Sequence, residues 1–191
     1  MTPTFRTSKP DSAADPGKPH LVLIGLPGSG KTTVGQAVAT ATGRTFLDID
    51  QEIERREGRS IGQIFGEKGE DYFRKKEREI TEELTFFGNM IVSPGGGWIA
   101  DPEVVAIIRP RAQLVYLKVS PEMALKRLGP TRMMRPLLTR PDPLAELKRL
   151  LDSRRMAYES ADHVVNTELL DLQRVIQMVT ELATVGVHTV R

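Results

Sequence analysis

A glycine-rich turn between an apolar segment and a helical pattern constrains this chain more than any other feature. The apolar segment at 20–25 leads into Gly25, Gly30, Lys31 and Thr32 at the spacing GxxxxGK[ST]. Glycines let backbone N–H groups close around phosphate oxygens, and the positive N-terminal end of the following helix adds to the attraction. An ordinary strand-to-helix turn does not need the lysine. The sequence therefore predicts a phosphate-binding loop, with Lys31 reaching the β- and γ-phosphates of a nucleotide and Thr32 ligating Mg2+.

Apolar segments alternate with segments of helical periodicity along the rest of the chain. Right-handed crossovers between parallel strands place the loops that follow the strands at one edge of the sheet, where ligands bind. The sequence therefore predicts an α/β protein with a five-stranded parallel sheet flanked by helices. The expected strands lie at about 20–25, 45–49, 90–93, 113–119 and 163–166.

Composition narrows the class of protein. The 191 residues suffice for one domain, and 39% hydrophobic with 27% charged residues is typical of a soluble globular protein. The apolar runs are too short to span a membrane, and the absence of cysteine excludes disulfides and thiolate sites. A formal charge of +2, without a basic and aromatic stripe, gives no support for nucleic-acid binding. We expect a cytoplasmic monomer with neither a nucleic-acid nor a membrane partner.

The chain is expected to consist of a short extension and one domain. Residues 1–19 are polar and lack apolar periodicity, which predicts a disordered N-terminal extension. Residues 20–191 then form a single domain. Within it, residues 129–143 are dense in proline and arginine, which predicts a mobile loop between two helices.

Two carboxylates follow the second expected strand. In the segment TFLDID, Asp48 and Asp50 are two residues apart, so that both side chains would point to the same face of a strand. One carboxylate near Mg2+ and a second near a substrate hydroxyl would suit phosphoryl transfer. The alternative is that Asp50 only caps the N-terminus of the next helix.

Five segments in this order make the chain resemble the shikimate kinase family. They are GLPGSGKTTVG, FLDID, GRSIGQIFGEKGEDYFRKKE, the GGG after the third strand, and RPLL, and the resemblance covers about residues 20–170. It implies the three-layer P-loop kinase fold with a mobile lid. It also implies transfer of the γ-phosphoryl group of ATP to the 3-hydroxyl of shikimate, a step toward chorismate and the aromatic amino acids, with one Mg2+ per subunit.

The resemblance implies roles for residues on the nucleotide side. Asp48 is expected to reach Mg2+ through water, next to Thr32. Arg135 matches the arginine of the lid, 129–143, that reaches the ATP phosphates and compensates their charge. Arg127 is a candidate for stacking on adenine. The phosphate-loop residues expected to bind ATP are Gly28, Ser29, Gly30, Lys31, Thr32 and Thr33.

The acceptor side follows from the chemistry of shikimate. Capture of its carboxylate needs cationic forks, and its reacting hydroxyl needs an acceptor. Arg74 matches the family's substrate arginine in the region 50–80, and Glu77 lies on the same helical face, where it would hold the guanidinium. The alternative for this pair is an exposed ion pair. Asp50 matches the carboxylate that bonds the shikimate hydroxyl, either as a general base or as an orienting group.

A glycine triplet, Gly95, Gly96 and Gly97, follows the third expected strand. Without Cβ atoms these residues allow the substrate to approach the backbone, and Gly96 matches the position whose N–H contacts shikimate. Pro94 and Trp98 depart from the small or aliphatic residues usual beside the triplet. Trp98 either lines the substrate pocket or packs outside it.

A second arginine for the shikimate carboxylate is expected on a helix at about 143–160. In the family this arginine lies four residues before a tyrosine. Tyr158 therefore selects Arg154 over Arg155, because positions i and i+4 share a helical face.

Two other hypotheses stand beside the kinase. A gluconate-type kinase shares the phosphate loop but not FLDID, YFR and GGG in this combination. A catalytically silent sensor of shikimate-like ligands would have lost one of the three expected catalytic residues. These are Lys31, Asp50 and Arg135, and the sequence has all of them.

Overall fold

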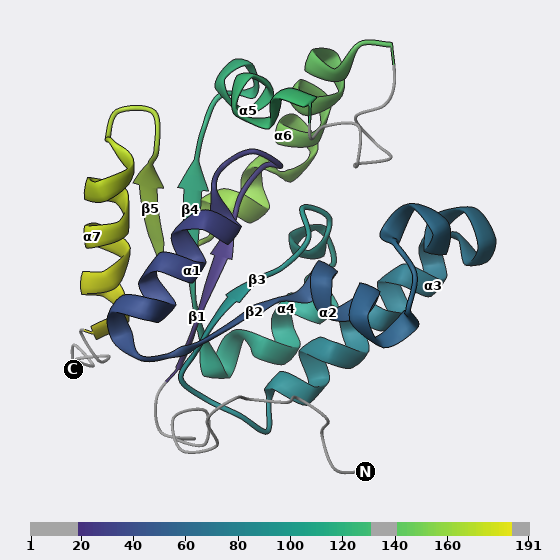
Figure 1. The fold of residues 1–191 in the computed structure, drawn as a ribbon, viewed down its shortest axis with the longest axis horizontal. Helices are drawn as coiled ribbons and strands as arrows, with labels where there is room; N and C mark the ends of the chain where they lie inside the picture. The colour runs from purple at the N-terminus through teal and green to yellow at the C-terminus, as the bar shows by residue number, and fades with distance from the viewer. Residues whose placement is uncertain (1–18, 131–140, 185–191) are drawn as a thin grey trace.

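The computed structural model describes residues 19–130 and 141–184, so the predicted extension lies almost wholly outside the described residues. A five-stranded parallel sheet forms the centre, in the order β2-β3-β1-β4-β5 (Figure 1). The predicted class and sheet are confirmed, with strand boundaries one residue off at most. The strands are β1 (His20–Ile24), β2 (Thr45–Asp48), β3 (Met90–Ser93), β4 (Ala112–Lys118) and β5 (His163–Asn166).

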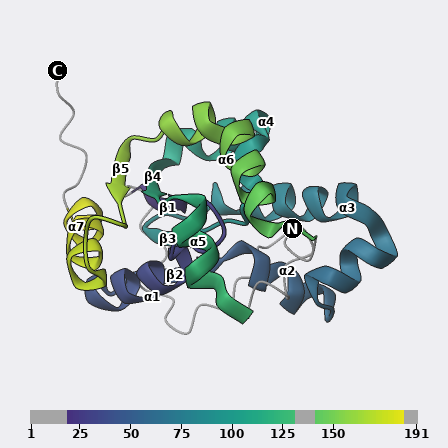
Figure 2. The same cartoon turned by 90° about the horizontal axis from the view of Figure 1, so that it is seen from above.

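Helices cover both faces of the sheet. Figure 2 shows α1 and α7 on one face and α4 and α6 on the other. None of the described helices is long and apolar enough to cross a membrane. The helices are α1 (Lys31–Thr42), α2 (Ile49–Glu57), α3 (Ile61–Leu84), α4 (Pro102–Ile108), α5 (Pro121–Leu128), α6 (Pro143–Glu159) and α7 (Leu172–Thr184), with short 3-10 turns η1 (Trp98–Ala100) and η2 (Arg109–Arg111).

The strands are apolar on both sides because each side of the sheet has its own core. All five residues of β1 are buried. Leu21 and Leu23 pack with α1 and α7, whereas Val22 and Ile24 pack with α3, α4 and α6. This is the pattern expected of a central parallel strand, whose near-continuous hydrophobicity reflects burial on two faces. The polar ends of the strands are therefore the places where chemistry can occur.

Helix α3 is long and bent. Its N-terminus carries a capping box, in which Ser60 and Gln63 each satisfy a backbone N–H of the other. Gly69 interrupts the helix with φ 81° and ψ 172°, a conformation that residues with a Cβ rarely adopt. The kink separates the first turns, where Ile64 packs in the core, from the longer part that carries Arg74 and Glu77.

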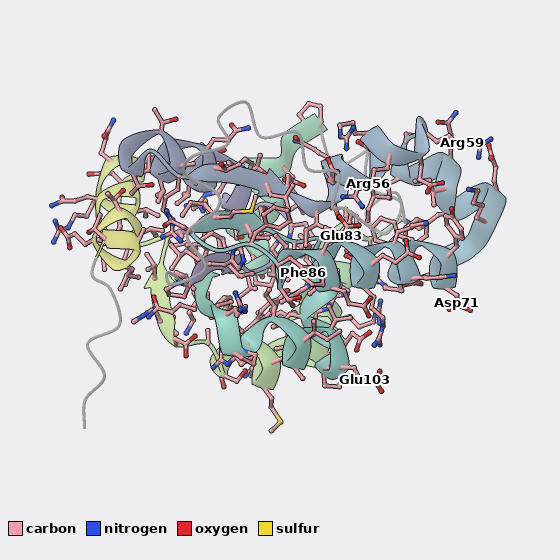
Figure 3. The ribbon with its side chains drawn as sticks, turned by 90° about the horizontal axis from the view of Figure 1, so that it is seen from below. Arg56, Arg59, Asp71, Glu83, Phe86 and Glu103 are labelled. Atoms are coloured by element: carbon pink, nitrogen blue, oxygen red, sulfur yellow. The ribbon has the colours of Figure 1, made fainter. Side chains whose placement is uncertain are left out.

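A forked ion pair fixes α2 against α3. Arg56 donates from Nη1 and Nη2 to the two carboxylate oxygens of Glu83, at 2.6 and 2.8 Å, and from Nε to Glu52 at 2.7 Å. Figure 3 shows Arg56 and Glu83 meeting where the two helices pass each other. Bidentate pairs of this kind constrain orientation as well as distance. The fork therefore fixes how Asp50 on α2 lies relative to α3.

A half-buried arginine joins segments that are distant in the chain. Arg44, after α1, donates to the carbonyls of Pro19, Asn89, Met90 and Ala183 at 2.6 to 3.3 Å. Burial lowers the pKa of Arg44 to about 10, which still leaves the guanidinium charged at neutral pH. The side chain thus ties the entry to β1, the start of β3 and the end of α7 together.

His20 is a buried histidine held in one tautomer by its neighbours. Its Nε2 donates to the carbonyls of Leu84 and Phe87 at 3.0 and 3.1 Å, and its Nδ1 accepts from the N–H of Met90 at 3.3 Å. A proton on Nδ1 would point at the N–H of Met90, which disfavours the charged form of the ring. Burial, with a smaller contribution from Arg44, lowers the pKa of His20 below its usual 6.5.

This environment predicts a pH dependence of stability. Below pH 6.5 the unfolded chain binds a proton at His20 that the folded chain does not, so the free energy of unfolding falls as pH decreases. The loss is at most about 1.4 kcal/mol per pH unit. Urea unfolding of wild type and His20→Gln between pH 8 and 5 measures it. We expect the wild type to lose more stability than the variant, and parallel curves would contradict the assignment.

Candidate active site

The phosphate-binding loop is tightly packed against its surroundings. A Cβ on Gly25, whose φ is 148°, would lie 2.7 Å from the carbonyl oxygen of Leu117. A Cβ on Gly28, whose φ is 86°, would lie 2.5 Å from the carbonyl oxygen of Ala124. Gly30 precedes α1 in the left-handed conformation, and no described side chain caps the helix there. The first N–H groups of α1 are thus directed at the site, as phosphate binding requires.

Lys31 lies at the start of α1 and folds back over the loop. Its Nζ donates to the carbonyl oxygens of Gly25 and Leu26 at 3.0 and 3.2 Å. These contacts hold the ammonium at the mouth of the loop. A phosphate group bound by the loop would lie within reach of this charge.

Asp48 and Asp50 reach the same cavity from different elements. Asp48 ends β2, accepts from the hydroxyl of Thr32 at 2.9 Å and caps α2 by accepting from the N–H of Gln51 at 3.3 Å. Asp50 lies in the first turn of α2. The predicted strand alternation of the two residues is therefore wrong, because the helix begins at Ile49. The alternative role of Asp50 as the N-cap is wrong as well, because Asp48 has it.

A cavity of about 170 Å³, the first cavity, brings together the ends of β1, β2 and β3. Thr32 and Asp48 supply it with adjacent hydroxyl and carboxylate oxygens, the ligands that Mg2+ prefers. These two residues therefore fit the predicted metal site. The lining residues are Gly28, Gly30, Lys31, Thr32, Thr33, Asp48, Asp50, Ser93, Pro94, Gly95, Gly96 and Leu128.

A second cavity of about 370 Å³ continues from the other side of the phosphate loop. Arg127 lines it and is held by Thr167, whose hydroxyl and carbonyl accept its Nη1 and Nη2 at 2.8 and 2.6 Å. Sequence analysis did not single out Thr167, although the loop after β5, like the loops after the other strands, must lie at the ligand-binding edge of the sheet. The lining residues are Gly28, Ser29, Gly30, Thr33, Val34, Arg127, Thr167, Leu170, Leu172 and Val175.

Arg74 and Glu77 form an ion pair on α3 in which Glu77 is buried and Arg74 is half-buried. Arg74 donates from Nη1 to Glu77 at 2.5 Å and from Nη2 to Glu70 at 2.8 Å. The side chain of Glu77 is 2% exposed, so the alternative of an exposed pair is wrong. Burial raises the pKa of Glu77 to about 7 against the opposing effect of Arg74, and the nearby charge of Asp50 raises it further. Two carboxylates thus lie close together beside the Arg74 guanidinium.

The glycine triplet covers this pair. A Cβ on Gly97 would overlap the guanidinium group of Arg74. A Cβ on Gly95 would overlap the Asp50 carboxylate and lie 2.9 Å from Oε1 of Glu77. The turn therefore fits over the charged groups only because it lacks side chains.

Arg154 reaches the same turn from α6. A Cβ on Gly96 would lie 3.7 Å from Nη1 of Arg154, which is 9% exposed. Arg155 points to solvent and pairs with Asp152 at 2.8 Å. Of the two arginines, the structure brings Arg154 to the site.

Tyr158 lies next to Arg154 on α6. Its ring is fully buried and stacks on Tyr116, with centroids 4.9 Å apart and an interplanar angle of 6°. Burial raises the pKa of Tyr158, and the adjacent Arg154 opposes that rise. The guanidinium of Arg154 thus lies next to a rigid aromatic pair.

The structure decides where Trp98 packs, but it does not test the predicted role of Arg135 in the lid. Trp98 is 2% exposed and belongs to the hydrophobic core, so it packs outside the pocket. Residues 131–140 lie outside the described residues. Arg135, and most of the predicted lid at 129–143, therefore remain predictions.

Comparison with known proteins places the chain among kinases of small molecules. The family model described as shikimate kinase matches residues 27–184. A shikimate kinase from Aquifex aeolicus is 40% identical over 78% of this chain and 87% of its own length. The structure of a shikimate kinase from Acinetobacter baumannii in complex with shikimate superposes with a TM-score of 0.81 and 36% identity, covering 86% of this chain and 92% of that one.

A more distant structural neighbour shares the fold of this chain but little of its sequence. A gluconokinase from Sinorhizobium meliloti covers 89% of this chain and 93% of its own, with a TM-score of 0.53 and 19% identity. At this identity the likeness shows the shared fold alone. The shikimate kinases match in sequence as well as in fold, which the gluconokinase does not.

Proposed function

The chain belongs to the shikimate kinase family, and on that basis we propose that it transfers the γ-phosphoryl group of ATP to the 3-hydroxyl of shikimate. The products are shikimate 3-phosphate and ADP. One observation supports this acceptor above others. Asp50, Arg74 and Arg154 come from three helices and meet around a single glycine turn beside the phosphate loop. One carboxylate and two guanidinium groups suit a substrate with both a hydroxyl and a carboxylate.

On the nucleotide side, the loop and the N-terminus of α1 would hold the phosphates in the first cavity. Lys31 would exchange its bonds to loop carbonyls for bonds to phosphate oxygens. The nucleoside would then extend into the second cavity, where Arg127 is held by Thr167. Arg135 would approach the phosphates from the lid and compensate the charge that develops during transfer.

Thr32 and Asp48 would hold one Mg2+ per subunit, Thr32 directly and Asp48 through water. The ion, when bound, supplies positive charge to the phosphate oxygens. The hydrogen bond between the two residues orients their oxygens before any ion arrives.

On the acceptor side, Arg74 and Arg154 would bind the shikimate carboxylate. Asp50 would accept the hydrogen bond of the 3-hydroxyl, orient its oxygen toward the γ-phosphate and take up its proton. Oε1 of Glu77 is buried and accepts no hydrogen bond from the described residues. It faces the same turn and is available to a further substrate hydroxyl.

We extend the proposal to the state of the protein, a cytoplasmic monomer without nucleic-acid or membrane partners. The large apolar side chains exposed among the described residues support a monomer, because they are divided among three places: the turn after α3, the C-terminal part of α6, and the segment from β5 to the start of α7. They are Phe86, Met156, Val164, Leu169 and Leu172.

An acceptor panel tests the activity. ADP release is measured with Mg·ATP and millimolar shikimate, gluconate or CMP, and without an acceptor to give the background hydrolysis. We expect shikimate-dependent turnover well above background and none with the other two. Turnover with gluconate would favour the alternative kinase. ATP binding without turnover on shikimate would instead favour a silent sensor.

Asp50→Asn tests the role of the acceptor carboxylate. The amide keeps the shape but cannot take a proton, so kcat should fall by about 10²- to 10⁴-fold. Equilibrium binding of Mg·ATP should stay near the wild-type value. The matched variant is Asp48→Asn, which should weaken Mg·ATP binding because Asp48 lies at the proposed metal site. Weak nucleotide binding by Asp50→Asn would reassign Asp50 to the metal.

Gly97→Ala tests the proximity of the turn to Arg74. The added Cβ displaces the guanidinium, so the KM for shikimate should rise by about tenfold or more while the KM for ATP stays the same. Gly66→Ala on α3 is the control, because a Cβ there meets no atom within 4 Å. Equal effects of the two variants would contradict the role of Arg74.

A further inference from the structure

We propose that Trp98 is a positioning residue of the acceptor site, and that its bond to Thr81 sets the affinity for the substrate carboxylate. This inference rests on the proposed function. It concerns a residue that touches no substrate and that the motifs of the chain left without a role.

Trp98 closes the glycine turn through its backbone. Its N–H donates to the carbonyl of Gly95 at 3.2 Å, and the N–H of Ala100 donates to the carbonyl of Gly97 at 3.0 Å. The end of the triplet is therefore also the start of the 3-10 turn η1. Whatever fixes the ring of Trp98 fixes the turn.

The ring of Trp98 is fixed by α3. Its indole Nε1 donates to the hydroxyl of Thr81 at 2.9 Å, and that hydroxyl donates to the carbonyl of Glu77 at 2.7 Å. Both Trp98 and Thr81 are buried, at 2% and 0% exposure. A chain of two bonds in a dry interior is stronger than the same bonds in water. It connects the glycine turn to the residue that holds Arg74.

Arg154, the other arginine of the site, also depends on the position of η1. Helix α6, which carries Arg154, packs against η1. The Trp98 turn thus lies between α3 and α6, the two helices that carry the proposed carboxylate ligands. Moving this turn changes the separation of the two guanidinium groups.

Moving the Trp98 turn should affect the binding of shikimate far more than that of ATP. A turn that shifts by a few tenths of an ångström changes the contacts of Gly97 with Arg74 and of Gly96 with Arg154. The phosphate loop packs against Leu117 and Ala124 and meets the turn through Pro27, next to Gly96, so the KM for ATP should change far less than the KM for shikimate. A role limited to core packing would instead lower the thermal stability and leave both KM values unchanged.

Three substitutions test the bond. Trp98→Phe removes the indole N–H but keeps an aromatic ring, and Thr81→Val removes the hydroxyl at nearly the same volume. Each should raise the KM for shikimate by about 3- to 10-fold, with kcat and the KM for ATP within about twofold. Thr81→Ser keeps the hydroxyl, so this variant should have the wild-type KM for shikimate. The double variant Trp98→Phe/Thr81→Val should resemble Thr81→Val, because that substitution already removes the bond from Trp98 together with the bond to Glu77.

Tyr72→Phe is the matched control. Tyr72 lies on α3 and bonds Glu57 on α2 at 3.0 Å, away from the glycine turn. The variant loses the hydrogen bonds of this hydroxyl to Glu57 and from Lys68, and both KM values should stay unchanged. An equal rise in the shikimate KM for this variant would contradict a specific role of Trp98.

Fluorescence gives a second measurement that does not depend on turnover. Trp98 is the only tryptophan of the chain, so its emission reports on this turn. Shikimate alone should change the emission, and titration of Thr81→Val should give a Kd weaker by the same factor as its KM. The inference is overturned if saturating shikimate leaves the wild-type emission unchanged.

The kinetic outcomes separate this inference from the proposed function. A wild type that is inactive on shikimate contradicts the function. An active wild type whose Trp98→Phe and Thr81→Val variants keep the wild-type KM for shikimate, or have additive effects, contradicts only the role of Trp98. If both variants fail to fold, the response of the wild-type emission to shikimate still decides the matter.

Discussion

The close approach of a glycine turn to charged side chains is the constraint on which the rest of the site depends. Gly95 and Gly97 lie directly on the carboxylate of Asp50 and the guanidinium of Arg74. The turn ends β3, which lies between β2 and β1 in the sheet. That strand order brings Asp48, the turn and the phosphate loop to one edge. The side chains of the acceptor site therefore lie next to the phosphate loop for two reasons. The strand order brings them to the same edge of the sheet, and the three glycines of the turn have no Cβ atoms to keep them apart.

Charge balance explains how such a site can be stable before a substrate binds. Burying a carboxylate is costly unless a cation compensates it, and the pKa of about 7 for Glu77 reflects the remaining cost. Arg74 compensates Glu77 through a short bond and reaches Glu70 as well. The forked pair of Arg56 and Glu83 then keeps the helices that carry these charges in register.

Local patterns predicted the strands, the phosphate loop and most of the charged residues, because each depends on neighbours in the chain. Asp50 shows where such patterns fail. The alternation in FLDID is that of a strand, yet the backbone becomes helical at Ile49, a boundary that the sequence pattern does not mark. Thr167 was missed because its contact with Arg127 spans 40 residues and exists only in the folded chain. The burial of Glu77 likewise depends on the glycine turn above it.

The two departures of the triplet from the family pattern have a common physical reason. Three consecutive glycines lose much conformational entropy when they are ordered, and they have no side chains with which to anchor themselves. Order must therefore come from the flanking residues. Pro94 restricts the backbone before the turn through its fixed φ, and Trp98 anchors the backbone after it through its indole bond to Thr81. A bulky residue beside the triplet is thus compatible with the site because its ring points away from the cavity, into the core that supports both arginines.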